Sequence, residues 1–427
     1  MSLKKPSRFM GSIEQIPALL YLVKWLVICG IVGALAGTAS AWFLISLDWA
    51  TELRENNFIL VMFLPVGGLL IGLLYYYAGK GTEGGNDLIL DELHRPARII
   101  PLKMAPLVFF GSVATHLFGG SAGREGTAVQ MGGAIADQFT RIFKLRPRDR
   151  ATLIIAGVSA GFASIFGTPL AGAVFALEVV ILGRMRYEAI YPAFLAALIG
   201  DQICHAWGVP HMIYEVTIIP DMTFAGIFWV IIAGIIFGLA GMFYSKLSNS
   251  IYEFFKAKVY YPPLRPFIGG VIIIAGVLAL GSTRYLGLGL PVIIESFHDE
   301  VPVYDFLFKI LFTAITLGAG FKGGEVTPLF FIGATLGNAL VWFIPLPLAL
   351  LAAMGFIAVF AGATNTPIAC TLMGIELFGA DAGIYIGLAC VTAYFFSGHT
   401  GIYGSQIVGS PKHILFGKHK GRSLRDL

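Results

Sequence analysis

The 427-residue sequence has few charged residues: Asp, Glu, Lys and Arg together make up 13% of it, and hydrophobic residues make up 57%. A soluble domain carries about 25% charged residues. So few charges cannot cover the water-exposed surface of a soluble protein of this length. We therefore expect lipid to cover much of the surface, and we predict an all-α, polytopic membrane protein.

The sequence also lacks the usual patterns for metals, disulfides and nucleotides. Its four cysteines, Cys29, Cys204, Cys370 and Cys390, include no CxxC pair, so we expect neither a disulfide framework nor a zinc site. The eight histidines show no metal-ligand spacing, and no G-K-[ST] motif occurs. We expect no cofactor and no metal.

Long uncharged runs are abundant. Each of residues 25–47, 58–79, 222–245 and 266–283 lacks Asp, Glu, Lys and Arg, and a spanning helix needs about 20 such residues. Residues 326–375 are uncharged over twice that length, with a corner at residues 345–347, which predicts two or more helices. The first run is too long for a signal-peptide core, so we expect it to remain in the protein.

Basic residues gather near the ends of the chain and in two internal loops. They are Lys4, Lys5, Arg8, Arg141, Lys144, Arg146, Arg148, Arg150, Arg184, Arg186, Lys412, Lys418, Lys420, Arg422 and Arg425. The positive-inside tendency places both termini in the cytoplasm. The net charge of +4 then reflects membrane topology, and we expect no nucleic-acid partner. We expect one transmembrane transport domain over residues 1–427 and no C-terminal cytoplasmic regulatory domain.

Two stretches of the chain repeat a pattern, about residues 17–207 and 222–416. Each reads E-x-T, then T-P-[LI]-A about 40 residues later, then Glu ten residues after that threonine. The matched positions are 125 and 325, 168 and 366, and 178 and 376. Many transporters are built from two such halves, often inverted.

Three Thr-Pro pairs, at residues 168, 327 and 366, resemble helix starts placed inside apolar sequence. Threonine is a good N-cap, and proline is favoured in the first helical position. A helix that begins at membrane depth leaves N–H groups that lipid cannot satisfy. Protein or a bound anion must satisfy them, and the helix dipole favours negative charge at that end.

The most specific motif is GGSAGREGT at residues 119–127. Its carboxylate, Glu125, lies in a glycine-rich loop just before a helix. An acid at a helix N-terminus can occupy an anion site itself and leave it when protonated. Such a side chain is both a gate and a proton carrier, and intramembrane acids are functional by default. The alternative is an Arg124–Glu125 pair that joins two helices.

These motifs resemble those of the CLC family of anion channels and transporters. Residues 123–126 (GREG) resemble the family's gating-glutamate motif, residues 161–178 its following helix pair, and residues 323–328 (GGEVTP) its second-half anion loop. Tyr403 lies where the family places a pore tyrosine. The resemblance implies two inverted halves with broken helices that meet at the membrane centre, a homodimer, and one anion pathway in each subunit.

Four departures from the family pattern resemble its bacterial branch that exports fluoride in exchange for protons. Asn86 stands where a loop serine is usual, and Thr127 replaces a proline. Glu325 replaces an apolar residue, and Val179 replaces the usual internal proton-transfer glutamate. The resemblance thus implies a fluoride/proton antiporter of the bacterial cytoplasmic membrane. Fluoride is strongly hydrated, so its site needs many strong donors.

The resulting candidate site has two parts. We expect Glu125 and Glu325 to gate the pathway and to carry protons. The expected anion-binding residues are Asn86, Gly126, Thr127, Val326, Thr327 and Tyr403.

Several residues have a structural alternative. Asn86 or Asp87 could cap the helix that follows, with Asp91 and Glu92 facing water. Thr327 could be a plain N-cap, and Tyr403 an interfacial aromatic residue. We expect Glu178 and Glu376 to make structural hydrogen bonds at helix ends and not to carry protons.

Two other functions compete with fluoride export. Within the same family, the chain could be a chloride channel or a chloride/proton exchanger, although Val179 argues against the ordinary proton-coupled chloride mechanism. Residues 157–161 fit the G-x-S-x-G motif of serine hydrolases. That motif needs a strand–turn–helix context, and here it lies in glycine- and alanine-rich sequence typical of helix packing. We therefore do not expect an enzyme.

Overall fold

The structure, a computed structural model, describes residues 15–212 and 214–427. Lys4, Lys5 and Arg8 lie outside the described residues. The elements up to the middle of the chain are α1 (Gln15–Asn56), α2 (Ile59–Met62), α3 (Leu64–Ala78), α4 (Asn86–His94), α5 (Met104–Leu117), α6 (Glu125–Ile142), α7 (Pro147–Phe166), α8 (Pro169–Glu178), β1 (Ile181–Leu182), η2 (Tyr187–Ala189) and α9 (Ile190–Ala206).

The later elements follow a similar order of long and short helices. They are α10 (Phe224–Lys258), α11 (Leu264–Leu280), α12 (Leu290–His298), α13 (Asp305–Gly318), α14 (Val326–Ala339), η3 (Leu340–Trp342), α15 (Leu348–Thr364), α16 (Pro367–Phe378), α17 (Gly383–Phe396), β2 (Ile407–Val408), η4 (Ile414–His419) and η5 (Leu424–Asp426). The two short strands pair in parallel, with Ile181 opposite Ile407. The predicted all-α class is confirmed.

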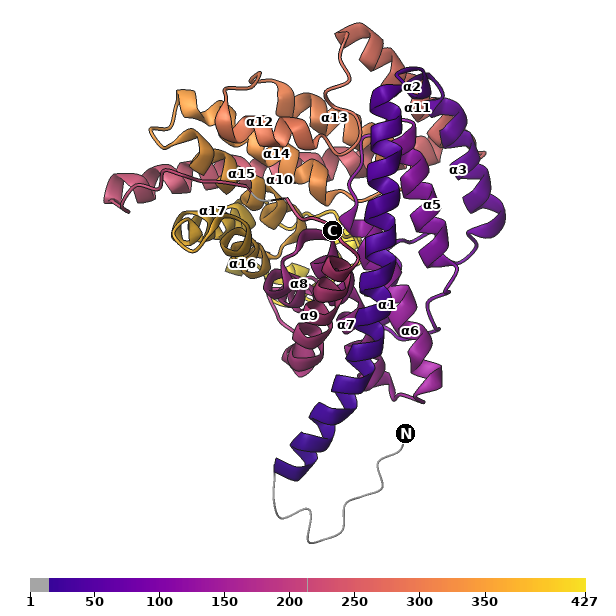
Figure 1. Cartoon of the computed structure of the whole chain (residues 1–427). Helices are drawn as coiled ribbons and strands as arrows, with labels where there is room; N and C mark the ends of the chain where they lie inside the picture. The colour runs from indigo at the N-terminus through magenta and orange to yellow at the C-terminus, as the bar shows by residue number, and fades with distance from the viewer. Residues whose placement is uncertain (1–14, 213) are drawn as a thin grey trace.

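The molecule contains both long helices that could span a membrane and shorter apolar helices. In the described residues, four helical segments are long and apolar enough to cross a membrane: Ile16–Asn56, Pro147–Phe166, Tyr187–Ala206 and Phe224–Lys258. Eight further apolar helices have 10–17 residues. Figure 1 shows α1 running from the lower end of the view to its top, while the shorter helices α8, α14 and α16 lie to its left. As predicted, the uncharged run 326–375 holds more than one helix, with its corner between η3 and α15.

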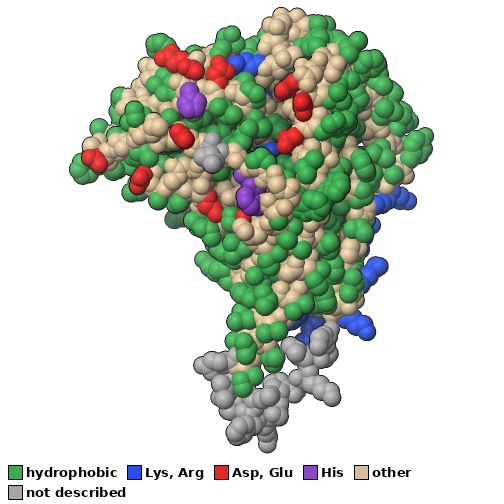
Figure 2. Space-filling view, viewed as in Figure 1, with side chains coloured by type: hydrophobic (Ala, Val, Ile, Leu, Met, Phe, Trp, Pro, Cys, Tyr) green, Lys and Arg blue, Asp and Glu red, His purple; other side chains and the backbone are tan. Residues whose placement is uncertain are grey.

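The outer surface is apolar. Hydrophobic side chains cover most of the face in Figure 2, while the acidic side chains lie in the upper half of the view. Large exposed residues include Leu26, Leu70, Phe224 and Leu278. This distribution fits a protein whose sides contact lipid and whose two ends differ in charge.

Several short helices begin in the protein interior. The residues Thr168 and Thr366, which precede α8 and α16, are fully buried. Neither threonine side chain caps its helix. The start predicted from Thr327 and Pro328 is wrong by two residues, because α14 begins at Val326 and Glu325 precedes it as the N-cap. The two extra residues bring Glu325 to the helix end.

Two glutamates supply the missing caps across the bundle. Glu178, the last residue of α8, accepts hydrogen bonds from the backbone N–H groups of Ile368 (3.2 Å) and Ala369 (2.8 Å) at the start of α16. Glu376 of α16 accepts those of residues 170 (2.9 Å) and 171 (2.8 Å) at the start of α8. Each helix thus caps the other, and the predicted structural role of both glutamates is confirmed.

A buried charge cluster fixes the connection between α4 and α5. Arg150 lies 2.7 Å from an oxygen of Asp137 and 3.1 Å from an oxygen of Glu92. Asp137 also accepts the backbone N–H of Ile100 (2.8 Å). The expectation that Glu92 faces water is therefore wrong, since it is only 5% exposed. Asp91 does lie on the surface, in an ion pair with Arg425.

The loops before α6 and α14 meet at the centre of the molecule. The backbone N–H of Gly123 donates to the carbonyl of Gly324 (2.6 Å), and the N–H of Gly324 donates to the carbonyl of Gly123 (2.7 Å). This crossed pair joins two motifs that are about 200 residues apart in the sequence. It brings the starts of α6 and α14 together.

Candidate functional site

Glu125 lies against the start of α14. One of its carboxylate oxygens, Oε2, accepts the backbone N–H of Thr327 at 3.1 Å, and the Thr327 hydroxyl donates to the other oxygen, Oε1. The side chain is fully buried. The carboxylate therefore occupies the donors that a helix N-terminus offers to an anion. Thr327 binds this carboxylate and is more than a local N-cap.

Arg124 is a weaker partner of the same carboxylate. Its Nε lies 3.8 Å from Glu125 Oε1, and this nitrogen is buried without a hydrogen bond in the described part of the protein. Its backbone N–H, in contrast, donates to Oε2 at 3.1 Å. A tight Arg124–Glu125 staple is thus not what holds the acid, because Thr327 provides the closer contacts.

Glu325 points the other way, toward α10. Its Oε1 accepts hydrogen bonds from the hydroxyls of Tyr244 (3.2 Å) and Ser248 (3.3 Å). These two residues are four apart on α10 and so lie on one helix face. They precede Glu325 by 81 and 77 residues, so nothing near Glu325 in the sequence indicates either partner.

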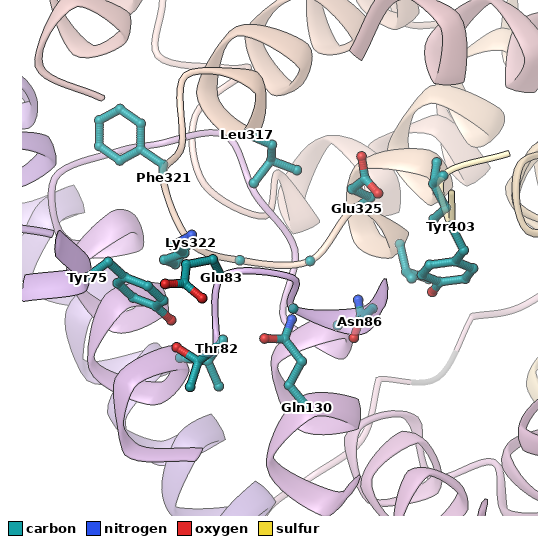
Figure 3. Close-up of a pocket in the computed structure, with 17 residues that line it drawn as sticks. Tyr75, Thr82, Glu83, Asn86, Gln130, Leu317, Phe321, Lys322, Glu325 and Tyr403 are labelled. Carbon is teal, nitrogen blue, oxygen red and sulfur yellow. The ribbon is translucent and has the colours of Figure 1, made fainter. Parts of the chain in front are cut away.

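A cavity of about 180 Å³ adjoins Glu325. Its lining includes four of the predicted anion-binding residues, Asn86, Gly126, Val326 and Tyr403. Figure 3 shows Glu325 and Tyr403 at one end of this cavity, Asn86 and Gln130 in the middle, and Lys322, Glu83, Thr82 and Tyr75 at the other end. We call this space the inner cavity. It brings both halves of the chain, and Glu325 of the two predicted acids, around a single polar space.

The inner cavity holds hydrogen-bond donors that no other described residue uses. The amide nitrogen of Asn86, the hydroxyl of Tyr403 and the amide nitrogen of Gln130 have no hydrogen-bond partner among residues 15–212 and 214–427. A Cβ atom at Gly126 would lie 3.0 Å from the Asn86 amide nitrogen. The absence of a side chain at Gly126 thus lets this amide approach the backbone at the start of α6.

Two of the alternatives for these residues are wrong. Asn86 is the first residue of α4, after Gly85, and neither it nor Asp87 caps that helix. Asp87 instead accepts the backbone N–H of Ser405 at 2.9 Å, next to Tyr403. Tyr403 is 6% exposed, so it is not an interfacial aromatic residue.

Thr127 lies apart from the other predicted residues. Its hydroxyl shares a 2.6 Å hydrogen bond with the hydroxyl of Ser112 on α5, and it is fully buried. The hydroxyl therefore joins α5 to α6, while Gly126 beside it lines the inner cavity. No position in the sequence predicts this partner, which comes from the preceding helix.

A smaller space lies on the other side of Glu125. Arg124, Glu125 and Thr327 line it, together with the stacked rings of Phe330 and Phe356, whose centroids are 4.0 Å apart. A larger cavity of about 450 Å³, lined by Arg54 and Arg284 among others, shares Met212 and Leu290 with this space. Glu125 thus lines this smaller space, while its neighbour Gly126 lines the inner cavity.

The serine motif is not arranged for hydrolysis. Residues 157–161 lie within α7, where the Ser159 hydroxyl donates to the backbone carbonyl of Ala193 at 2.7 Å. A nucleophile elbow needs a strand–turn–helix context. The expected helix-packing role fits, because the Gly157 and Gly132 backbones are in close contact.

The chain is similar to several known proteins. It is 51% identical, over 94% of its length and 90% of the relative, to the chloride/fluoride channel protein of Pseudomonas syringae pv. tomato. It is 26% identical to the H(+)/Cl(−) exchange transporter ClcA of Vibrio parahaemolyticus, over 82% and 81% of the two chains. Its structure matches that of a CLC-type fluoride/proton antiporter with a TM-score of 0.88 and 35% identity, over 90% of this chain and 98% of that one.

The family assignment rests on most of the sequence. The family model described as voltage gated chloride channel matches residues 67–398. That range contains both acids, the crossed loops and most of the inner cavity. The chain therefore belongs to the voltage-gated chloride channel (CLC) family of membrane transport proteins.

Proposed function

We propose that the protein exports fluoride across a bacterial cytoplasmic membrane in exchange for protons. The observation that carries this proposal is the Glu125 carboxylate at the start of α14, bound by the N–H and hydroxyl of Thr327. A carboxylate bound in this way stands where an anion would bind. The names of the chloride/fluoride channel protein and of the fluoride/proton antiporter support fluoride as the anion.

Protonation of Glu125 drives the exchange. A neutral carboxylic acid is a poorer acceptor for the α14 N–H group and gains less from the helix dipole. The side chain then leaves these donors free for fluoride from the inner cavity. When Glu125 loses its proton on one side of the membrane and returns, it displaces the anion, which couples the two movements.

Asn86 and Tyr403 replace part of the water around fluoride. Both present unused donors to the inner cavity, and the backbone at Gly126 and Val326 adds the ends of two helices there. A small, strongly hydrated anion gains more from such donors than a larger one does. Glu325, held by Tyr244 and Ser248, passes the proton between this cavity and Glu125.

The end of the molecule with the inner cavity faces the cytoplasm. Lys103 donates to the carbonyl of Ala78, where α3 ends beside this cavity. The same connecting segment, between α4 and α5, also contacts the basic residues 141–150, because Arg150 donates a hydrogen bond to the carbonyl of Arg98. The positive-inside tendency assigns that loop, and with it both termini, to the cytoplasmic side. Two chains form a homodimer, each with its own pathway.

Anion efflux from proteoliposomes tests the proposal. Vesicles are loaded in parallel with fluoride or chloride, and the external pH is recorded. Fluoride that leaves faster than chloride, with protons driven inward against their gradient, is the expected result. Faster chloride flux without proton movement would identify a chloride channel instead.

Two variants test the assigned roles in the same assay. Glu125→Gln should abolish proton-coupled flux, and Glu325→Gln should slow proton movement more than anion movement. Glu253→Gln is the matched control, because Glu253 is exposed and, among the described residues, its one ion pair is with Lys256. Full coupled flux in the Glu125 variant would rule out its gating role.

A further inference from the structure

Lys322 places an ammonium group beside the inner cavity, and no carboxylate among the described residues forms an ion pair with it. It is in the loop before α14 and lines the cavity at the end away from Glu325 (Figure 3). In the described part of the protein its ammonium group forms no ion pair and no hydrogen bond. Its Nζ lies over the ring of Tyr75, 4.1 Å from the ring centroid. A cation on an aromatic face keeps most of its charge available to an anion.

The carboxylate next to Lys322 offsets its charge only in part. Glu83 lines the same end of the cavity and interacts with Lys322 through its charge, but the two form no ion pair in the part of the chain that the structure describes. The Oε2 of Glu83 instead accepts the backbone N–H of Gly81 at 2.7 Å. The remaining positive charge of Lys322 therefore acts on the contents of the cavity.

The surrounding backbone holds Lys322 in this direction. Its N–H donates to the Thr115 hydroxyl at 3.3 Å, and its side-chain stem packs on α5 at Gly111. A Cβ atom at Gly111 would lie 3.0 Å from both Cβ and Cγ of Lys322. Because Gly111 has no side chain, the lysine can lie along α5 and extend its ammonium group to the cavity.

Gln130 provides a hydrogen-bond donor between Lys322 and the expected anion-binding residues Asn86 and Tyr403. It follows Gly126 by four residues on α6, so the two lie on one helix face. The side chain is 8% exposed and lines the cavity, and its amide nitrogen has no hydrogen-bond partner in residues 15–212 and 214–427. An anion that leaves Lys322 for Asn86 and Tyr403 passes this amide.

We propose that Lys322 and Gln130 form an entry site, at which a partly hydrated fluoride ion waits in the inner cavity before it reaches Asn86 and Tyr403. This inference rests on the proposed function and extends it. Lys322 attracts the anion from the cytoplasm and raises its local concentration, as charged, low-dielectric clefts do. The lysine is a recruiting residue, so its charge should affect KM for fluoride rather than kcat.

The first test measures initial fluoride efflux at increasing fluoride concentration. Lys322→Met should raise KM by about tenfold, the low end of the range for electrostatic focusing, and leave kcat unchanged. Lys322→Arg should keep KM near that of the unaltered protein. Lys103→Met is the matched control, since Lys103 is exposed on the same side and does not line the cavity. An unchanged KM in Lys322→Met would overturn the proposal.

A second test restores the charge chemically. The four native cysteines are buried, so the thiol of a Lys322→Cys variant can be modified selectively in detergent before reconstitution. Its thiolate attacks 2-aminoethyl methanethiosulfonate, forms a disulfide and releases methanesulfinate. The added ammonium group should lower KM toward the original value, and the 2-sulfonatoethyl reagent should raise it further. Equal effects of both reagents would show that bulk, not charge, matters and would overturn the entry site.

The two proposals fail in different ways. If the unaltered protein carries chloride without protons, the proposed function is wrong, and the entry site is scored on the chloride KM of the same variants. If the unaltered protein exchanges fluoride for protons and Lys322→Met lowers only kcat, the entry site alone is wrong. Monodisperse elution and an unchanged thermal midpoint confirm that each variant is folded.

Discussion

Truncation of Glu178 should destabilise the protein without affecting proton coupling. In Glu178→Ala, the backbone N–H groups of Ile368 and Ala369 lose their acceptor. Each buried donor left without a partner costs about 1–3 kcal/mol, so the two together cost about 2–6 kcal/mol. Glu178→Gln keeps one carbonyl oxygen and should lose roughly half of that, about 1–3 kcal/mol.

The matched control is the reciprocal cap. Glu376→Ala also removes the acceptor of two N–H groups, but Glu376 is partly exposed whereas Glu178 is 6% exposed. Water can reach the freed groups more easily there, so the loss of stability should be smaller. Thermal unfolding in detergent, followed by tryptophan fluorescence, ranks the variants.

Transport by the same variants separates a structural from a proton-carrying role. Glu178→Gln should keep the proton-to-anion ratio of the unaltered protein after reconstitution, because its carboxylate caps α16 and lines neither the inner cavity nor the space beside Glu125. An unchanged thermal midpoint together with lost proton movement would refute the reasoning. That result would make Glu178 a proton carrier in place of the absent acid at Val179.

Two further substitutions test the packing around the site. Arg150→Met should prevent folding, because the buried carboxylates of Asp137 and Glu92 would lose their cation. Breaking such a buried ion pair costs about 3–5 kcal/mol. A monodisperse, stable product would contradict this. Gly126→Ala should leave the fold intact and slow fluoride efflux roughly tenfold, because the new methyl group meets the Asn86 amide and a 1 Å misplacement can cost about 100-fold in rate. An efflux rate equal to that of the unaltered protein would show that this amide does not contact the anion.

The sequence predicted those features that short, continuous motifs determine. Glu125 follows glycines and precedes a helix, so its place at a helix end could be read from residues 119–127. Glu325 could be found because an acid in an otherwise uncharged stretch is costly. The cap-like pattern of Glu178 and Glu376 was also visible, since each lies in the last turn of a short helix, ten residues after the threonine of a Thr-Pro pair.

Contacts between distant segments could not be predicted in this way. The hydroxyls that hold Glu325 belong to Tyr244 and Ser248, and the partner of Thr127 is Ser112 on another helix. Propensity suggested a cap at Asn86, but the packing of its loop against α6 overrides that preference. The place of Gln130 beside Gly126 could have been predicted, since their spacing of four residues puts both on one face of α6.

The crossed hydrogen bonds between Gly123 and Gly324 have a consequence for how the centre of the protein is assembled. Each loop alone resembles the open edge of a sheet, with an N–H and a C=O directed toward a missing neighbour. The other loop supplies that neighbour from about 200 residues away, so neither segment forms a finished ion-binding surface by itself. Assembly of the binding centre is thus a late, long-range event in folding, because loop closure over such a distance is entropically costly.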